Sequence, residues 1–352
     1  MEKSVGALLK NLEGPVLVTG HTGFKGTWLI RYLKILGIEA VGYSLPPKAD
    51  SLYLKSNLLG KTTEQFGDIR RLDDFAQFVQ RTKPGVILHL AAQALVSDSY
   101  FDPIGTFETN VMGTANVLQV GKSTPGLKAI GVVTTDKVYR NHNDKNRFKE
   151  DDPIFGSDPY SASKAACENV VQAWKNIATE NHDFPISSLR AGNVIGGGDL
   201  SPSRLIPDLV RGHSTRTEVV IRNIQSTRPW QHVLDPLTGY LLAVEHSIRE
   251  ETHQTFNFGP DEPSLSVGEV IDIFQQEWRD LQIVHSPVTS FQYESNFLDL
   301  NSELAKNNLG WRPAYKQKTA IHQTINWWDD YFNKRSNACE IVDEQIKEYL
   351  KN

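Results

Sequence analysis

Tyr160 and Lys164 lie four residues apart in the stretch DPYSASK, at the start of a segment with a helical pattern. Side chains four apart on a helix are neighbours on one face. A tyrosine has a pKa of about 10 in water, but nearby cations stabilise the phenolate and make it a usable base near neutral pH. Such pairs also occur by chance on solvated helix faces, so this one needs support from elsewhere in the chain.

A second group of reactive side chains follows an apolar run. The stretch IGVVTTDKVY leads into Thr135, Asp136 and Lys137. Consecutive residues of an extended strand point to opposite faces, so Asp136 and Lys137 can share a site only if the strand has already ended. A lysine is neutral only about once in 2,500 molecules at pH 7, so a base here needs a lowered pKa, and an aspartic acid donor needs a proton. A surface ion pair that closes a loop is the alternative interpretation.

Three glycines, Gly20, Gly23 and Gly26, recur in TGHTGFKG where the first predicted strand passes into the first predicted helix. Glycines there let the backbone approach a pyrophosphate at the helix N-terminus, which favours an anion. A tight turn alone is the weaker interpretation. Together with the Tyr160–Lys164 pair, the motif predicts a dinucleotide cofactor.

The adenosine half of that cofactor would meet the ends of the second and third strands. Ser44 stands where an acid usually binds the adenosine ribose, and no arginine is present there for a 2′-phosphate, so NAD is favoured over NADP. Asp68 and Ile69 end the third predicted strand and are placed to border the adenine. An acid at that point is equally suited to capping the next helix.

Short β-rich runs alternate with longer amphipathic segments as far as Ala191. This alternation is typical of an α/β fold in which helices cover both faces of a parallel sheet. After Ala191 the pattern loosens into GNVIGGGDLSPSRLIPD and the order of elements becomes irregular. We therefore expect the later segments to form a smaller, mixed C-terminal lobe without a clean boundary.

Composition excludes several classes of function. The chain has 352 residues, is 39% hydrophobic and carries 37 Lys and Arg against 42 Asp and Glu, which leaves no broad basic face for nucleic acid or an anionic membrane. Two cysteines are too few for a disulfide framework or a cysteine zinc site, and we predict no metal. With no apolar signal sequence or membrane-spanning run, we expect a cytoplasmic protein.

The motifs resemble the extended short-chain dehydrogenase/reductase family over essentially the whole chain. The matching stretches are TGHTGFKG, HLAAQ, ETNVMGT, VVTTDKVY, PYSASK, RAGNVIGGGD and LGWRP. The resemblance implies a doubly wound Rossmann sheet in residues 1–190, completed by 223–256. It assigns residues 191–222 and 257–352 to an interleaved lobe that binds a nucleotide sugar.

Within the family, GHTGFKGTWL, TTDK, DPYSASKAACEN, RLIPDLVR and TRPWQHVLDPLTGYLLA look most similar to the 4,6-dehydratases of CDP-glucose. This similarity implies NAD-dependent oxidation at C4 of a nucleotide-linked hexose, loss of water across C5 and C6, and return of hydride to C6. The product would be CDP-4-keto-6-deoxyglucose. Arg140 and Ser157 stand where such enzymes are expected to carry an acid and a glycine, so the nucleobase and the sugar stay open.

The resemblance also implies roles for single residues. Tyr160 takes the proton of the C4 hydroxyl, Lys164 tunes it and holds the nicotinamide ribose, and Thr135 hydrogen-bonds the C4 oxygen. Lys137 is the candidate base for C5, and Asp136 the candidate acid for the hydroxyl leaving C6. The implied cofactor-binding positions are Gly20, Thr22, Gly23, Phe24, Gly26, Ser44, Asp68, Ile69, Ala91, Ala92, Gln93, Asn110, Tyr160 and Lys164.

A diphosphate anchor for the substrate is expected downstream. The planar fork of arginine donates two bonds at once to phosphate oxygens. Three arginines follow the glycine loop at 196–198: Arg204, Arg222 and Arg228. By resemblance, Asn193, Arg228 and the backbone near Leu205 contact the pyrophosphate, and Asn257 lies near the nucleotide.

Other functions and the assembly state stay open. A nucleotide-sugar 4-epimerase or reductase shares Tyr160, Lys164 and NAD but needs no base for C5; a dehydratase of another NDP-hexose and a non-catalytic NAD-binding regulator are further alternatives. By resemblance we expect a homodimer through helices at about 104–122 and 161–179, with Val117, Val170 and Val171 in the contact.

Overall fold

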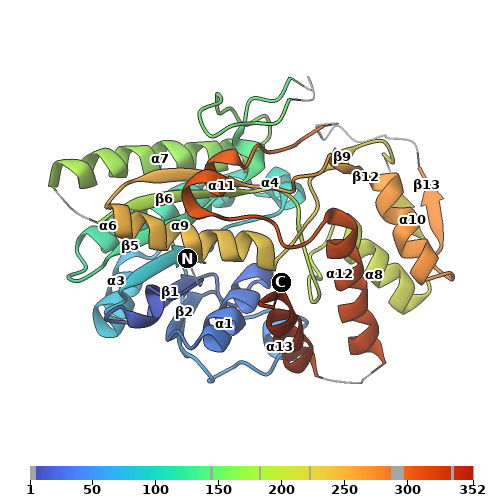
Figure 1. Cartoon of the computed structure of the whole chain (residues 1–352), viewed down its shortest axis with the longest axis horizontal. Helices are drawn as coiled ribbons and strands as arrows, with labels where there is room; N and C mark the ends of the chain where they lie inside the picture. Colours follow the sequence, from blue (N-terminus) through green and yellow to red (C-terminus); the bar gives the residue numbers. More distant parts are fainter. Residues whose placement is uncertain are drawn as a thin grey trace.

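The computed structural model describes residues 5–142, 146–181, 184–221, 223–286, 297–333 and 337–351. A parallel sheet of seven strands lies at the centre, in the order β11-β6-β5-β4-β1-β2-β3 (Figure 1). β2 and β3 lie on one side of β1, and β4, β5, β6 and β11 lie on the other. The strand order therefore reverses between β1 and β4. The predicted α/β fold with a doubly wound sheet is therefore confirmed.

The strands at the centre of the sheet are short runs buried at every position, whereas the edge strand β3 is polar and partly exposed. This pattern arises because helices cover both faces of the sheet. The seven strands are β1 (Val16–Thr19), β2 (Ala40–Ser44), β3 (Thr63–Phe66), β4 (Val86–His89), β5 (Ala129–Val133), β6 (Ile186–Ala191) and β11 (Gln254–Phe258).

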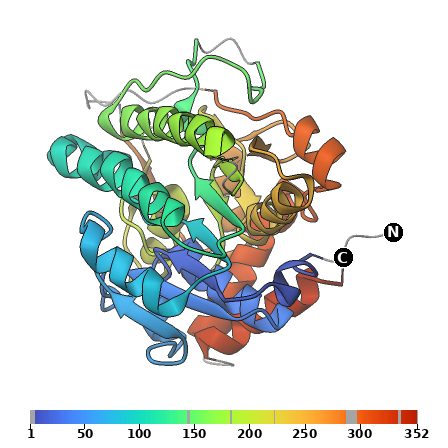
Figure 2. The ribbon, with the colours of Figure 1, turned by 90° about the vertical axis from the view of Figure 1, so that its left-hand side faces the viewer.

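Alternate residues of each strand enter two separate cores. In β1, Val16 and Val18 belong to the core on one face and Leu17 to the core on the other. The first face is covered by α1 (Phe24–Leu36) and α9 (Leu234–Glu250), and the second by α3 (Leu72–Thr82), α6 (Gly113–Lys122) and α7 (Pro159–Asn181). Figure 2 shows α6 and α7 together on one face and α9 on the other.

The helix predicted over about 104–122 is built from three pieces. α5 (Pro103–Phe107) passes through a π-helical turn (Glu108–Met112) into α6. Val117 and Val171 are fully buried beneath the sheet, and Val170 packs against the same core. The prediction that Val117 and Val171 form a dimer contact is therefore wrong, since their apolar area is already used within one chain. Val170 is only half-buried, and its part in a dimer contact stays a prediction.

The smaller lobe joins short helices to pairs of strands: β10 with β7, β12 with β9 and β13 with β8. Its strands are β7 (Val194–Ile195), β8 (Val219–Ile221), β9 (Thr227–Arg228), β10 (Gln231–His232), β12 (Leu265–Ser266) and β13 (Ile283–His285). The remaining helices are α2 (Leu52–Lys55), α4 (Val96–Phe101), α8 (Leu205–Thr215), α10 (Val267–Glu277), α11 (Glu303–Leu309), α12 (Gln317–Phe332) and α13 (Ala338–Tyr349).

The chain differs from the predicted division in two places. β11 runs to Phe258, beyond the predicted end of the sheet domain. α13, which falls inside the predicted lobe, packs on α1 instead, where Arg31 Nε donates to Asp343 Oδ1 at 2.8 Å (Figure 1). The C-terminal helix is therefore part of the layer that covers the sheet.

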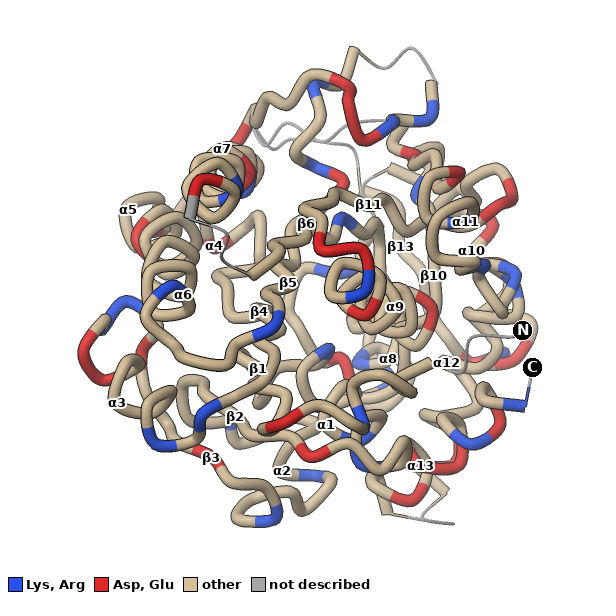
Figure 3. Tube along the Cα trace, turned by 60° about the vertical axis from the view of Figure 1, so that its left-hand side comes forward, with Lys and Arg blue, Asp and Glu red and all other residues tan. Residues whose placement is uncertain are grey.

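Acidic and basic residues are interspersed along the trace in Figure 3. None of the helices in the described ranges is both long enough and apolar enough to cross a bilayer.

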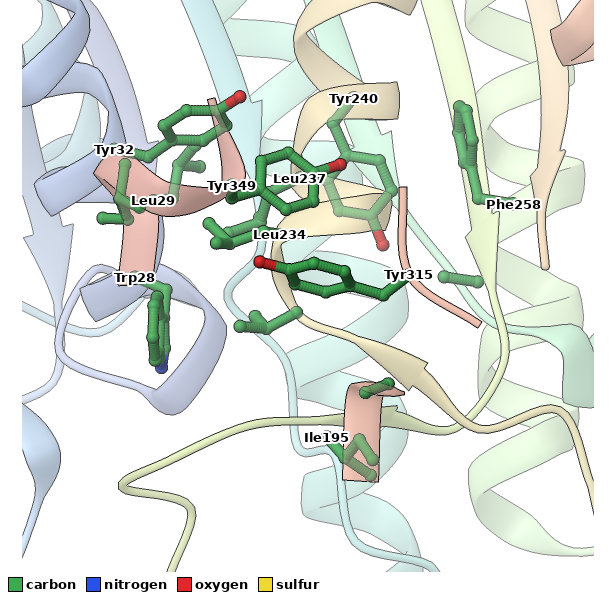
Figure 4. Packing of buried hydrophobic residues seen from close by; sticks show 14 of the residues in the cluster. Trp28, Leu29, Tyr32, Ile195, Leu234, Leu237, Tyr240, Phe258, Tyr315 and Tyr349 are labelled. Atoms are coloured by element: carbon green, nitrogen blue, oxygen red, sulfur yellow. The ribbon is translucent and has the colours of Figure 1, made fainter. Parts of the chain in front are cut away.

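Asp235 anchors the C-terminal segment on α9. Its Oδ1 accepts hydrogen bonds from the Ala314 backbone at 2.8 Å and from the Tyr349 hydroxyl at 2.9 Å, and its backbone carbonyl accepts one from the Trp311 indole. Figure 4 shows the apolar and aromatic side chains of α1, α9 and the C-terminal segment that surround this point, among them Tyr32 and Tyr349. Burial raises the pKa of Asp235 to about 7.

This pKa predicts how the stability of the protein depends on pH. An aspartic acid whose folded pKa lies above its ordinary value of 3.8 holds its proton more tightly in the folded state. Its contribution to stability is therefore full below about pH 4, falls as the pH rises towards 7 and is then constant. We expect Asp235→Asn to flatten the fall in melting temperature across that range. Asp73→Asn, on the exposed side of α3, is the control, and an unchanged slope in Asp235→Asn would contradict the assignment.

Candidate active site

The glycine turn brings the end of β1 onto the N-terminus of α1. Gly20 has a φ of +74°, in the region that glycine favours. A side chain at Gly26 would place its Cβ 2.1 Å from the carbonyl oxygen of Gly20. Gly23 is the N-cap of α1 and no side chain caps the helix, so its first N–H groups are free for an anion. The turn fits the pyrophosphate of a dinucleotide, with the Phe24 amide among these groups.

The predicted adenosine end lies beside this turn. The hydroxyls of Thr22 and Ser44 lie 2.8 Å apart. Asp68 follows β3 and forms hydrogen bonds with Arg70, which hold the pKa of its carboxyl below the usual range. Because α3 has no side-chain cap, the capping interpretation of Asp68 is wrong. Ile69 is buried and packs directly against Gly113, where a Cβ would lie 2.7 Å from Ile69 Cγ2.

The loop after β4, residues 91–93, is fastened to α7 through the π-helical turn. Asn110 is buried in that turn; its Oδ1 accepts from the Gln93 backbone at 2.8 Å, and its Nδ2 donates to Ser163 Oγ at 2.9 Å. Ser163 in turn donates to the carbonyl oxygen of Tyr160 at 2.7 Å. Ala91, Ala92 and Gln93 are thereby held beside the helix that carries the tyrosine.

The strand β5 ends at Val133, before the reactive residues begin. Residues Asp136–Val138 form a 3₁₀ turn with Thr135 at its N-cap. Thr135 Oγ1 accepts from the Lys137 backbone at 3.3 Å and donates to Asp136 Oδ1 at 3.0 Å. The condition that the strand must have ended is met, and Lys137 Nζ lies 3.6 Å from Asp136 Oδ1.

The two charged side chains of this turn differ in burial. The Asp136 side chain is 1% exposed and that of Lys137 32% exposed. Asp136 Oδ2 has no hydrogen-bond partner in the part of the chain that the structure describes. A Cβ added to Gly192 would lie 3.0 Å from that oxygen, so the chain leading into Asn193 runs directly past it. Asp136 thus turns a free oxygen inward, which a simple surface ion pair would not do.

Tyr160 and Lys164 meet the same turn from α7. The Thr135 hydroxyl lies close enough to the Tyr160 hydroxyl to act on its pKa, which it lowers, and Lys164 Nζ donates to the Val133 carbonyl at 3.1 Å. Burial raises the pKa of Tyr160 to about 12 and lowers that of Lys164. Burial outweighs the opposing effects of Thr135 and of the Arg204 charge on Tyr160, so the neutral phenol is favoured.

Arg204 and Leu205 lie at the start of α8. Arg204 Nη1 is 3.1 Å from Asp199 Oδ2, and the Arg204 side chain is 38% exposed. Its charge acts to lower the pKa of Tyr160, so the arginine lies within electrostatic reach of the reactive turn. The structure therefore joins Arg204 to the Thr135–Tyr160 group.

The other predicted substrate residues have different positions. Arg228 is buried in β9 and donates to the Thr227 carbonyl at 2.8 Å. Asn257 is fully buried; its Oδ1 accepts from the Tyr139 hydroxyl and its Nδ2 donates to the Phe148 carbonyl. Its amide is thus engaged by the protein, and through Tyr139 it supports the end of the 3₁₀ turn. Arg222 lies outside the described residues.

Comparison with known proteins agrees with this geometry. The model of the NAD dependent epimerase/dehydratase family matches residues 16–259. This chain belongs to that family. Its predicted relationship to the extended short-chain dehydrogenases/reductases is confirmed.

Members of the NAD dependent epimerase/dehydratase family with known activities resemble the whole chain. It is 38% identical over 321 residues, 89% of either chain, to the CDP-glucose 4,6-dehydratase of Salmonella typhimurium. It is 26% identical to a dTDP-glucose 4,6-dehydratase of Xanthomonas campestris, covering 89% of this chain and 92% of that one.

Solved structures of the family share the fold. A UDP-glucose-4-epimerase from Stenotrophomonas maltophila with bound NAD superposes with a TM-score of 0.80 at 22% identity, covering 92% of this chain and 100% of that one. A dTDP-glucose 4,6-dehydratase from Bacillus anthracis in complex with NAD gives 0.76 at 21% identity, covering 91% and 98%.

Two residues beneath the site were not found from the sequence. Glu168 on α7 accepts from Arg190 Nε at 2.9 Å and Nη2 at 3.0 Å, and from the Thr134 hydroxyl at 2.5 Å. Arg190 also donates to the Tyr139 hydroxyl at 2.7 Å. Glu168 lies one helical turn after Lys164 and so on the same face of α7. An acidic residue on the face of a helix that covers the sheet could have predicted a buried ion pair from the sequence.

Removal of one partner of this buried pair should destabilise the protein strongly. Glu168→Ala leaves Arg190 buried without its counter-ion, so we expect a loss of roughly 3–5 kcal/mol in the free energy of unfolding by urea titration. Replacing both residues by methionine should recover much of that loss. The control Glu108→Ala breaks an exposed pair with Arg70 and should cost less than about 1 kcal/mol. Equal losses in the two single variants would contradict the assignment.

Proposed function

We propose that this protein is an NAD-dependent nucleotide-sugar 4,6-dehydratase that converts CDP-glucose to CDP-4-keto-6-deoxyglucose. The observation that carries the proposal is the 3₁₀ turn after β5, which joins the buried Asp136 and the half-exposed Lys137 to Thr135 and Tyr160. An acid and a base next to a Tyr–Lys pair suit oxidation followed by elimination. The 38% identity to a CDP-glucose 4,6-dehydratase supports the choice of substrate.

The first half of the reaction belongs to Tyr160, Thr135 and Lys164. When bound at the glycine turn, NAD supplies the oxidant for C4 and later returns the reducing equivalents to C6. Tyr160 takes the proton of the C4 hydroxyl, and Thr135, whose hydroxyl lies near that of Tyr160, orients the C4 oxygen. The raised pKa of Tyr160 must fall for this step, so the positive charges of Lys164 and of the cofactor are needed beside the phenol.

The second half belongs to the 3₁₀ turn. Once C4 is a carbonyl, the C5 proton is acidic, and Lys137 removes it while the C6 hydroxyl leaves. Asp136 Oδ2 has no protein partner and is the oxygen suited to deliver the proton that converts the leaving hydroxyl to water. Lys137 is then protonated and Asp136 is ionised, so the two form an ion pair across 3.6 Å. As C6 is reduced, Lys137 gives its proton back to C5. Asp136 regains a proton and Tyr160 loses the one from the C4 hydroxyl by exchange with solvent, which restores the starting state.

The nucleoside diphosphate would be held at the edge of the lobe. Arg204 lies within electrostatic reach of Tyr160 and can offer its guanidinium to a diphosphate oxygen. Asn193, which follows the glycine that touches Asp136, and Arg228 complete the proposed anchor. Asn257 does not contact the diphosphate in this proposal. Its amide donates to the Phe148 carbonyl and so supports the loop that contains Phe148.

The variants of the reactive turn should separate oxidation from elimination. Tyr160→Phe should block both steps, with a loss of about 10²- to 10⁴-fold. Lys137→Ala should still oxidise C4 but fail to exchange the C5 hydrogen in deuterated water, so that a 4-keto hexose with its C6 hydroxyl can be trapped by borohydride. Asp136→Asn should slow the loss of water while sparing C5 exchange. The control is Lys128→Ala, an exposed lysine before β5.

A panel of CDP-, dTDP-, UDP- and GDP-hexoses analysed by mass spectrometry tests the whole proposal. A loss of one water from CDP-glucose is expected. An unchanged mass with inverted C4 configuration would instead establish a 4-epimerase, which needs no base at C5. Normal elimination by Lys137→Ala would show that another residue takes the proton.

We propose further that the protein is a homodimer in the reducing environment of the cytoplasm. Apolar residues are exposed around α5 and the π-helical turn, with Ile104 70% and Met112 56% exposed, which supports a contact there. The free thiols of Cys167 and Cys339 suit such a compartment.

The assembly proposal predicts a monomer when that face becomes charged. Ile104→Glu combined with Met112→Glu should halve the mass seen in sedimentation, because buried carboxylates oppose association. The control Leu59→Glu alters another exposed apolar residue, away from α5, and should leave the dimer intact. A double variant that keeps the mass of the unaltered protein would exclude this face.

A further inference from the structure

Lys25 lies in the glycine turn but is not explained by the fold. It is the second residue of α1, directly after the N-cap and Phe24. Its ammonium lies 5.9 Å from the centre of the Tyr240 ring on α9. Within the ranges that the structure describes, no hydrogen bond or ion pair of the Lys25 side chain is found.

The charges around Lys25 are mostly positive. Lys164 on α7 and Arg204 before α8 both act against its charge, and Asp136 is the acid that favours it. Burial, reinforced by the two cations, lowers the pKa of Lys25 to about 7. Lys25 is half-buried. Holding a partly desolvated cation near two other cations without a partner does not stabilise the fold.

Two further polar atoms near this lysine are also unsatisfied. Asp136 Oδ2 and the Tyr240 hydroxyl are buried, and neither has a hydrogen-bond partner among the described residues. Burial raises the pKa of Tyr240, and the charges of Tyr160 and Asp136 act on it in the same direction. Buried polar atoms are nearly always paired, so this group indicates space for a ligand that brings oxygen atoms.

We propose that Lys25 is a ligand-binding residue whose ammonium pairs with a diphosphate oxygen and takes up a proton as the ligand binds. The chemistry is shared by the pyrophosphate of the dinucleotide and by the diphosphate of the nucleotide sugar. Lys25, Lys164 and Arg204 then share one anion, which offsets the repulsion among them. The inference rests on the proposed function, since that function brings both diphosphates to this edge of the sheet.

The proton uptake fixes the pH dependence of binding. The groups that act on Lys25 are Lys164 from α7, Arg204, Asp136 and, from α9, Tyr240, on which Tyr160 acts in turn. A bound anion raises the pKa of an ammonium. Affinity should therefore be constant below about pH 7 and fall as the pH rises above it, because binding must then collect a proton.

The test uses the full chain freed of nucleotide and isothermal titration with NAD and with CDP-glucose, each alone so that no turnover occurs. Lys25→Met should weaken one of the two ligands by about 10- to 100-fold, the range expected for a charge-assisted hydrogen bond. Lys25→Arg should keep most of the affinity and lose the fall above pH 7. Lys34→Met, an exposed lysine of the same helix, is the matched control.

The outcomes distinguish the sources of the diphosphate. Weaker NAD binding with unchanged CDP-glucose binding assigns Lys25 to the cofactor, and the reverse assigns it to the substrate. Titrations of the unaltered protein in buffers of different ionisation enthalpy should show net proton uptake at pH 8, which tests the inference without any variant. Equal affinities for Lys25→Met and no proton uptake would overturn it. If the unaltered protein binds neither ligand, the proposed function itself fails.

Discussion

The buried ion pair between Glu168 and Arg190 joins three elements that each carry part of the site. Glu168 comes from α7, Arg190 from β6, and Thr134, which donates to Glu168, from the end of β5. Removing two charges from water is costly, and the cost is offset only when both are fully hydrogen-bonded. α7 therefore cannot slide along the sheet without breaking bonds that water does not replace. This fixes Tyr160 next to Thr135.

The parallel sheet supplies the second constraint. All seven strands end at the same edge, so loops from distant parts of the chain meet there. The approach is close enough that a Cβ on Gly20 would lie 2.8 Å from the Ala91 backbone nitrogen. Side chains gathered this way become buried, and burial determines their protonation. Tyr160 is held as a neutral phenol and the ammonium of Lys164 is weakened until ligands change the local charge. Burial and the surrounding charges thus set the protonation of the two groups that would act first on a substrate.

The local parts of this design could be predicted from the sequence. Alternating apolar runs gave the parallel sheet, because only strands covered on both faces are apolar throughout. Glycine spacing gave the dinucleotide turn, since Gly20 and Gly26 occupy places where a Cβ would collide with backbone. The spacing of Tyr160 and Lys164 gave their shared helix face. In each case the physical cause acts between residues that are close in the sequence, so the sequence pattern alone reveals it.

The remaining features were decided by contacts between segments far apart in the chain. Val117 has the pattern of an interface residue, but the sheet buries it. Asn257 resembles a ligand contact, but Tyr139 and Phe148 engage its amide. Asp136 is buried where the chain after β6 passes its carboxylate, whereas the adjacent Lys137 keeps a third of its side chain exposed. Residue types and their spacing determined which chemistry was available to this protein. Which side chains are desolvated, paired or left with a free oxygen was decided by the tertiary structure alone, because burial and long-range hydrogen bonding do not exist before the segments meet.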